Sequence, residues 1–304
     1  MKRTIKTAVV TGPTGAIGTA LCRLLSGMGV RVCAVIRPES PRRKHLEGIE
    51  CVECDISQLE RLPELVPSAD AFFHLSWAKT TGAGRNDMLA QIDNIRYTVD
   101  AVHAARRLGC SVFVGAGSQA EYGRHNEALA CHTPCFPENG YGMAKLCAGQ
   151  MSRVECEKLD IDPIWPRILS VYGPCDGMGS MVMGTIARLL RGEKPSLTAG
   201  EQLWDYLYAD DAALALYLMA LHGRRGAVYP LGSGQARPLR TYIEALRDAI
   251  DPALPLGFGE VPYGAMQVMR LEADISALVR DTGWRPKVDF PTGIRQTIDW
   301  MKRQ

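Results

Sequence analysis

The feature that most constrains the fold stands near the start of the chain, where a short apolar run ends in three evenly spaced glycines. The run Ala8–Val10 is followed by Gly12, Gly15 and Gly18, and an amphipathic segment extends over residues 16–28. Strand, glycine turn and helix in this order place free helix N–H groups against a pyrophosphate. Gly12 permits the turn, Gly15 lets the backbone approach the phosphates, and Gly18 allows the helix to pack closely on the strand. Because three spaced glycines are a weak signal alone, an ordinary strand–turn–helix unit is the alternative.

Beyond this turn the chain alternates apolar runs with segments of helical periodicity, which is typical of a parallel sheet covered on both faces. The predicted strands are 31–36, 49–54, 71–75, 111–115, 163–169 and 227–231, and the predicted helices are 88–107, 142–159, 180–191, 210–222 and 239–249, with two more between 272 and 302. We therefore predict an α/β fold with a doubly wound parallel (Rossmann) sheet and a cofactor site at the carboxyl ends of its strands. Residues 1–174, with returning segments near 204–232, are expected to form this domain. The remaining segments of 175–304 are expected to form a smaller C-terminal substrate-binding lobe.

Composition narrows the choice of partners. The formal net charge is +2, and no apolar run approaches the length of a membrane span, so we expect neither nucleic acid nor a membrane as partner. The basic start Met1–Arg3 precedes an apolar run that Thr11–Pro13 ends too early for a signal peptide. We therefore expect a cytoplasmic protein.

The ten cysteines are scattered along the chain. Cys51 and Cys54 have the spacing of half a zinc site, but no second pair exists to complete four ligands. Cys131, His132 and Cys135 are a weaker metal candidate in a predicted loop, and overall we expect reduced thiols and no metal. Four others are expected to lie in the core as small apolar groups: Cys22, Cys33, Cys110 and Cys147.

The end of the second predicted strand bears on the choice of cofactor. An acidic residue there would bind the ribose hydroxyls of NAD, but this chain has Ile36 followed by Arg37, with Arg42 close behind. A guanidinium suits the 2′-phosphate of NADP, so we favour NADP over NAD. Glu39 could still serve a ribose hydroxyl, which keeps NAD open. Asp55, at the end of the third strand, is placed to meet the adenine amino group.

The spacing of Tyr141 and Lys145 puts a phenol and an ammonium on one face of a predicted helix. Hydride transfer at a carbinol carbon needs a proton relayed to the same carbon, and a free phenol has a pKa of ~10. We expect Lys145 to lower the pKa of Tyr141, which would make the phenol a usable acid or base, and to hold the nicotinamide ribose. Ser118 follows a strand and precedes a turn, so its hydroxyl can bond the reacting oxygen. A plain helix face is the alternative, because this spacing is common by chance.

These residues belong to a longer series of motifs. In chain order the motifs are Thr11–Gly18, Asp55, His74–Ala78, Asn94, Ser118 with Tyr122–Gly123, Tyr141 with Lys145, Arg167 with Val171–Pro174, Trp204–Asp211 and Gly283–Pro286. Their order and spacing resemble the extended short-chain dehydrogenases/reductases, in particular the NAD-dependent epimerase/dehydratase family that acts on nucleotide sugars. The resemblance covers essentially the whole chain.

The resemblance implies roles for individual residues. It implies that Ser118, Tyr141 and Lys145 are catalytic. It implies a cofactor site made by Gly12, Thr14, Gly15, Ala16, Ile17, Gly18, Arg37, Asp55, Ile56, Leu75, Tyr141 and Lys145. The lobe after Pro174 would hold the nucleoside diphosphate of the substrate, and the substrate site would include Ser118, Gln119 and Arg270. Arg270 is the candidate phosphate ligand, with a plain surface arginine as the alternative.

Other polar residues have structural interpretations. We expect His74 to be a structural residue at the end of a strand that lines the cofactor cleft. Asp205–Tyr206 and Asp210–Asp211 could suggest paired catalytic carboxylates. The resemblance implies instead that they mark a strand and a helix start, and we prefer an N-cap aspartate at that helix start.

Departures from the family pattern guide the choice of reaction. Gln119 and Ala120 stand where the water-eliminating members carry Asp-Glu, and neither side chain can act as acid or base, which argues against a 4,6-dehydratase. We favour an NAD(P)-dependent reductase of an NDP-4-keto sugar. The alternatives are an NDP-sugar 4-epimerase with tightly bound NAD, and a non-catalytic NAD(P)-binding regulator on the same fold. A homodimer through helices 88–107 and 142–159 is expected by family analogy.

Overall fold

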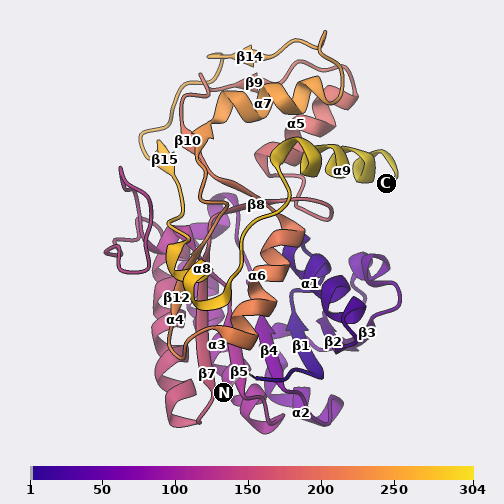
Figure 1. Cartoon of the computed structure of the whole chain (residues 1–304), viewed down its shortest axis with the longest axis vertical. Coiled ribbons are helices and arrows are strands. Elements are labelled where there is room, and N and C mark those ends of the chain that lie inside the picture. Colours follow the sequence, from indigo (N-terminus) through magenta and orange to yellow (C-terminus); the bar gives the residue numbers. More distant parts are fainter. Residues whose placement is uncertain (1–2) are drawn as a thin grey trace.

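In the computed structural model, which describes residues 3–304, the glycine turn joins an inner strand of a parallel sheet to its first helix (Figure 1). The main sheet has the order β3-β2-β1-β4-β5-β7-β12, with β6 also paired to β7, and its pairs are parallel. Its strands are β1 (Thr7–Thr11), β2 (Arg31–Ile36), β3 (Glu50–Glu53), β4 (Ala71–His74), β5 (Val112–Gly115), β6 (Gly117–Ser118), β7 (Asp162–Ile168) and β12 (Val228–Leu231). The chain reverses direction across the sheet between β1 and β4, and this reversal opens a crevice at the carboxyl ends of these strands.

Helices cover both faces of the sheet, as expected from strands that are continuously apolar. One face carries α1 (Ala16–Gly27), α6 (Ala209–His222) and α8 (Ser276–Thr282), and the other carries α2 (Leu62–Leu65), α3 (Met88–Arg107) and α4 (Gly140–Lys158). The 3-10 helices are η1 (Pro41–Leu46), η2 (Ile56–Arg61), η3 (Gly82–Asn86) and η4 (Gln119–Glu121). Along β1, Ala8 and Val10 enter one core and Val9 the other, because successive side chains of a strand point to opposite faces.

A smaller lobe stands at the carboxyl edge of the sheet (Figure 1). Its elements are β9 (Ser196–Leu197), β10 (Leu203–Trp204), β13 (Arg237–Pro238), β14 (Gly257–Phe258), β15 (Arg270–Leu271), α5 (Met181–Leu190), α7 (Leu239–Asp248) and α9 (Phe290–Lys302). Two short parallel strands, β8 (Ser170–Tyr172) and β11 (Tyr206–Tyr208), connect it to the main domain. Aromatic rings pack the junction; for example, Tyr242 lies 4.7 Å from Phe290 between ring centroids.

The predicted strands and long helices are present with boundaries shifted by up to about two residues. The predicted lobe of residues 175–304 needs one correction. Helix α8 and Trp284 pack in the large core beside α6, so this segment belongs with the main domain. Cys22, Cys33 and Cys110 are buried as predicted, but Cys147 is exposed on α4, since the helical periodicity places it on the outer face.

The strand expected at Asp205–Tyr206 is present as β11, but the N-cap prediction for Asp210–Asp211 is wrong. Helix α6 begins at Ala209, and its N-cap is Tyr208. Asp211 instead accepts the backbone N–H groups of Lys287 and Val288 at 2.9 and 2.8 Å. Asp210 pairs with Arg23. Asp205 accepts the backbone N–H groups of Ser233, Gly234 and Ala273. Asp205 and Asp211 fasten loops because they satisfy backbone donors, whereas Asp210 forms an exposed ion pair.

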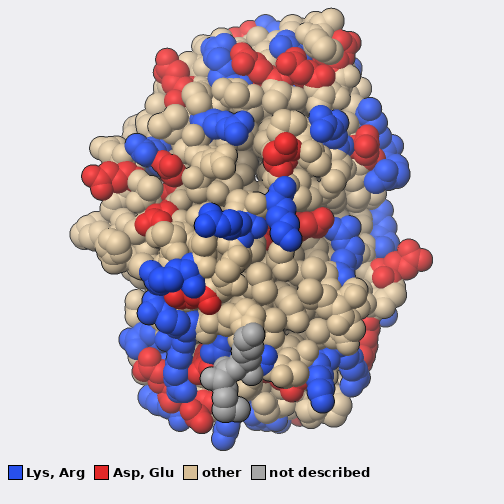
Figure 2. Space-filling model, in the orientation of Figure 1, with Lys and Arg blue, Asp and Glu red and all other residues tan. Residues whose placement is uncertain are grey.

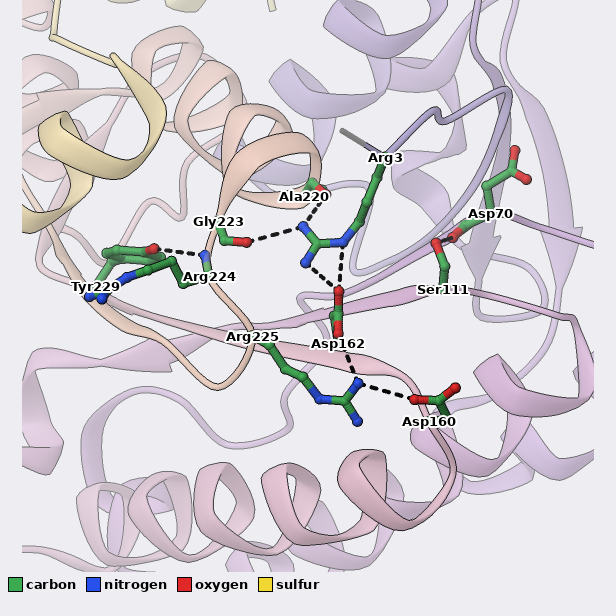
Figure 3. Close-up of polar contacts among 10 residues, drawn as sticks. All are labelled: Arg3, Asp70, Ser111, Asp160, Asp162, Ala220, Gly223, Arg224, Arg225 and Tyr229. Carbon is green, nitrogen blue, oxygen red and sulfur yellow. Dashed lines mark hydrogen bonds and ion pairs between the residues drawn. The ribbon is translucent and has the colours of Figure 1, made fainter. Parts of the chain in front are cut away.

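Ion pairs close the amino edge of the sheet (Figure 3), at the end of the molecule away from the lobe (Figure 1). Arg3 Nε donates to Asp162, the first residue of β7, at 2.9 Å, and its Nη1 donates to the carbonyls of Ala220 and Gly223, both at 3.1 Å. Arg225 pairs with the same Asp162 at 3.3 Å. The network ties the start of the chain to β7 and to the end of α6.

On the surface, acidic and basic side chains are interspersed over the face shown in Figure 2. Among residues 3–304, no helix combines the length and the apolar character that crossing a bilayer requires.

Candidate functional site

The glycine turn after β1 has the geometry of a phosphate cradle. Gly12 has φ +69°, and a Cβ there would stand 2.8 Å from the amide nitrogen of Ser76. A Cβ on Gly18 would come within 2.1 Å of the Gly12 carbonyl oxygen, so helix and turn touch. A Cβ on Gly15 would meet no atom within 4 Å. Gly15 is also the N-cap of α1 and supplies no side-chain cap, so the first-turn N–H groups face open space and fit a pyrophosphate.

A cavity of about 650 Å³ opens from this turn toward the end of β2. The predicted cofactor residues that line it are Gly12, Thr14, Gly15, Arg37, Ile56 and Leu75. Arg42 and Lys79 line it too, and the lining contains no Asp or Glu. Within residues 3–304, the side chains of Arg37, Arg42 and Lys79 form no ion pair, so three cations face a cavity without a counter-charge.

Asp55 follows β3, as predicted, but its side chain is engaged locally. It is absent from the described lining of the cavity. Its carboxylate caps η2, accepting the N–H of Ser57 at 2.9 Å and the Ser57 hydroxyl at 2.7 Å. An Asp directly before a turn satisfies local donors first. Contact of Asp55 with an adenine ring therefore stays a prediction that the geometry does not favour.

A second cavity, of about 280 Å³, adjoins the first through Gly12, Gly15 and Leu75. The structure brings the following predicted residues together here: Ala16, Ile17, Gly18, Ser118, Tyr141 and Lys145. Two predicted substrate residues lie outside its lining, Gln119 and Arg270. Arg270 pairs with Glu272 at 2.6 Å, which neutralises the charge proposed for a phosphate.

Tyr141 lies in the first turn of α4, a helix whose N-cap Asn139 accepts the N–H of Gly142 at 2.9 Å. The ring meets Trp77 edge to face, with centroids 6.1 Å apart. Burial raises the pKa of Tyr141; a hydrogen bond from Ser118 and the charge of Arg85 lower the pKa, and Glu121 raises it further. The phenol is thus protonated near neutral pH and can act as a proton donor.

We expected the Lys145 ammonium to lower the pKa of the Tyr141 phenol, but the side chain of Lys145 is engaged elsewhere. Its Nζ donates to the carbonyl of Ala116 at 2.6 Å and lies 3.7 Å from the Trp77 ring centroid. The ring centroid of Tyr141 is 5.8 Å away. Burial lowers the pKa of Lys145 to about 7, because an ammonium out of water is disfavoured. Lys145 therefore carries little charge for Tyr141 above that pH.

Ser118 is held by a capping box at the start of η4. Its Oγ accepts the N–H of Ala120 at 3.2 Å, and its own N–H donates to Glu121 Oε1 at 2.8 Å. Glu121 is fully buried, accepts from Trp165 at 3.0 Å and pairs with Arg167 at 2.7 Å. Glu121 is thus engaged in fixing the serine and is not free to serve as an acid or base.

His74 ends β4, as the structural interpretation expects. It is 2% exposed, and its Nδ1 lies 3.0 Å from the Thr11 hydroxyl. Burial, with a smaller effect of Lys145, lowers the pKa of His74 to about 3, so the imidazole is neutral. It joins two neighbouring strands beneath the glycine turn.

Sequence reasoning missed four residues around these cavities: Lys79, Arg85, Trp77 as a ring partner, and Asp176 in the lining of the second cavity. All lie on loops or short turns, where no periodicity reports position. One signal was available for Asp176, because it lies two residues after the motif Val171–Pro174.

The doubly wound sheet, the glycine turn and a Ser, Tyr and Lys around one cavity define the class of short-chain dehydrogenase/reductase folds. Residues 8–232 match the model of the NAD dependent epimerase/dehydratase family, and the chain belongs to this family.

Comparisons with individual proteins agree with this membership. The dTDP-glucose 4,6-dehydratase of Mycobacterium tuberculosis is 26% identical over 313 residues, which cover 97% of this chain and 92% of that protein. The Shigella flexneri enzyme of the same name is 26% identical over 186 residues, only 52% of its own length and 58% of this chain.

Solved structures share the fold. A UDP-N-acetylglucosamine 4-epimerase from Methanobrevibacter ruminantium, in complex with UDP-N-acetylmuramic acid, superposes with a TM-score of 0.88 at 22% identity, covering 100% of both chains. RMD from Pseudomonas aeruginosa, complexed with NADPH, superposes with a TM-score of 0.81 at 22% identity, covering 98% of this chain and 100% of that one.

Proposed function

We propose that this protein is an NADP-dependent reductase of a nucleotide-linked 4-keto sugar. The observation that carries the cofactor choice is the first cavity, in which Arg37, Arg42 and Lys79 face open space and no carboxylate is present. A 2′-phosphate gains charge-assisted hydrogen bonds from such cations, whereas ribose hydroxyls are best bound by a carboxylate. Proteins of the same fold are complexed with NADPH in one structure and with NAD in others, so the choice depends on the cavity and not on the fold.

The cofactor would lie across both cavities, with its pyrophosphate at the turn Gly12–Gly15. When bound, it supplies a hydride to a carbonyl carbon. Tyr141 then donates its phenolic proton to the carbonyl oxygen, and Ser118 donates a hydrogen bond to the same oxygen. The products are an alcohol and the oxidised nicotinamide, and the phenolate is reprotonated from solvent. No further acid or base is needed for this reduction.

The same groups argue against dehydration of the sugar. Eliminating water needs an acid and a base beside the serine, where this chain has Gln119 and Ala120. Glu121, next in sequence, is bound to Arg167 and has no exposed surface. These residues therefore argue against assigning to this chain the dehydratase activity for which the relatives are named.

A 4-epimerase is the second candidate, favoured by the near-complete superposition on an enzyme of that name. An epimerase oxidises and re-reduces one carbon, so it keeps its cofactor through the cycle. The non-catalytic regulator is less well supported, because a sensor needs only the glycine turn and has no use for Ser118, Tyr141 and Lys145 together.

We also propose that the protein is a homodimer through α3 and α4, which pack on each other. Large apolar side chains are exposed on this pair of helices: Met88, Leu89, Ile92, Met143, Met151 and Val154. Burial of these side chains against a second copy would remove their apolar surface from water, which supports the proposal.

The test supplies an NDP-4-keto-6-deoxyhexose with NADPH and follows the loss of reduced-nicotinamide absorbance. Separately, UDP-hexoses are supplied with no added cofactor. Stoichiometric NADPH oxidation supports the reductase. Conversion of a UDP-hexose to its 4-epimer, with no net change in cofactor, would replace it by the epimerase.

A further inference from the structure

Arg85 lies where η3 meets the start of α4. Asn86 Oδ1 accepts the backbone N–H of Gly140 at 2.9 Å. A Cβ on Gly140 would stand 3.0 Å from the carbonyl oxygen of Arg85 and 2.7 Å from Met88 Sδ, so the two segments are in direct contact. The backbone of η3 is thereby fixed against the residue that precedes Tyr141.

The guanidinium of Arg85 covers one face of the Tyr141 ring. Its Cζ lies 4.5 Å from the ring centroid, and Trp77 meets the same ring edge to face. A guanidinium over an aromatic face is attracted by the ring quadrupole. Within the part of the chain that the structure describes, the Arg85 side chain forms no ion pair and no hydrogen bond, so the ring is its described partner.

Lys145, the cation that the helical spacing assigned to Tyr141, points elsewhere. Its Nζ is engaged by the carbonyl of Ala116 and stacked on Trp77, 5.8 Å from the Tyr141 ring centroid. Arg85, unlike a buried lysine, keeps its charge at every pH of interest. Of the two cations, Arg85 is therefore the nearer to the phenol ring and the one whose charge is permanent.

We propose that Arg85 is a positioning residue for proton transfer by Tyr141, fixing one face of the phenol and supplying the positive charge that stabilises the phenolate once the proton has left. The inference rests on the proposed function, in which the phenolic O–H bond breaks and a new O–H bond forms on the carbonyl oxygen. The electron pair of the broken bond stays on the phenolate, beside the guanidinium. Loss of that charge would make the proton harder to release.

Charged groups reach the phenol from several elements. Arg85 comes from η3, Lys145 from α4 and Glu121 from η4, and Asp176 lines the far side of the cavity. Burial raises the pKa of Tyr141, the hydrogen bond from Ser118 and then the charge of Arg85 lower the pKa, and Glu121 raises it. Removing Arg85 leaves burial and Glu121 opposed by Ser118 alone, so the midpoint of Tyr141 ionisation moves to higher pH.

The experiment compares Arg85→Gln, which removes the charge, with Arg85→Lys, which keeps it. The matched control is Arg96→Gln, because the Arg96 guanidinium also covers a tyrosine ring, 4.9 Å from the centroid of Tyr97, on the exposed face of α3. Tyrosine ionisation is followed by NMR of protein labelled at the phenolic carbon, and the Tyr141 signal is identified by its absence in Tyr141→Phe.

The Tyr141 midpoint is expected to rise by roughly 1 pH unit in Arg85→Gln, by less in Arg85→Lys, and not at all in Arg96→Gln. The alkaline limb of turnover with the keto sugar shifts by the same amount in the same order. An unchanged Tyr141 midpoint in both Arg85 variants overturns the proposal. Because the titration needs no substrate, a wild type that fails to reduce keto sugars refutes the proposed function and leaves this test intact.

Discussion

Two groups of arginines, one at each edge of the main sheet, differ in whether they already have a protein partner. At the amino edge, Arg3, Arg224 and Arg225 are each paired with a carboxylate and bind neighbouring segments together. At the carboxyl edge, Arg37 and Arg42 line a cavity and form no ion pair within residues 3–304. The first group stabilises the fold, and the second remains available to a ligand.

This contrast separates stability from function on one sheet. Cations that already have protein partners contribute to folding, and a ligand would have to displace those partners. Cations that face a carboxylate-free cavity contribute mainly when an anion arrives. Variants at the two edges should therefore have effects that do not overlap, which the following predictions test.

The largest effect is expected at the carboxyl edge, for Tyr141→Phe. The ring and its contacts with Trp77 and Arg85 remain, and only the proton donor is lost. Turnover should fall by ~10²-fold or more while cofactor binding and the free energy of unfolding stay close to wild type. A variant that keeps more than about a tenth of the wild-type rate would remove the general-acid role.

The next effect concerns Arg37→Ala, compared with the same change at Arg43. The Arg37→Ala variant should bind NADPH roughly tenfold or more weakly than the wild type does. Its affinity for NADH should change little, because only NADPH loses a charge-assisted partner. Arg43 already pairs with Glu53 at 2.8 Å and is absent from the cavity lining, so Arg43→Ala is the control. Titration of both nucleotides, monitored by fluorescence, decides the matter; equal losses for the two nucleotides would contradict the role.

A pH effect is expected from Lys145. Burial lowers its pKa to about 7 in the free protein, and a bound cofactor that accepts a hydrogen bond from the ammonium raises the pKa again. Binding then takes up a proton, so affinity is highest below about pH 7 and weakens as pH rises above it. Calorimetry in buffers of different ionisation enthalpy measures this uptake. Lys145→Met should bind more weakly and with no such proton uptake; the same uptake in that variant would assign the proton elsewhere.

The Asp162→Ala change, at the amino edge, should have the smallest effect on cofactor affinity. It should nevertheless lower the free energy of unfolding clearly. Arg3 and Arg225 would lose their shared partner, which should cost about 2 kcal/mol in the free energy of unfolding. Urea denaturation measures this, and NADPH affinity should not change. Glu50→Ala breaks an exposed pair with Arg31 and should cost less than about 1 kcal/mol. A loss of NADPH affinity in Asp162→Ala would break the separation of the two edges.

Much of this fold could be predicted from the sequence, because buried parallel strands are continuous apolar runs and the long helices are periodic. The junction strand β8 could not be predicted, since three residues carry no period, and β11 was expected only through the family resemblance. Ser118, Tyr141 and Lys145 could be selected from spacing, and the structure places all three on one cavity. Two features of the site could not be predicted: that the Lys145 side chain points toward Ala116 and Trp77, and that the Arg85 guanidinium covers the Tyr141 ring. Both depend on tertiary contacts between a loop and α4.

If the unpaired cations at the carboxyl edge select a 2′-phosphate, the wild-type protein must distinguish NADPH from NADH. Equilibrium binding of the two nucleotides, to protein freed of any nucleotide carried through purification and at fixed ionic strength, measures this directly. We expect NADPH to bind tighter by about tenfold or more, with the difference shrinking as salt is raised. Equal affinities, or tighter binding of NADH, would contradict this selection.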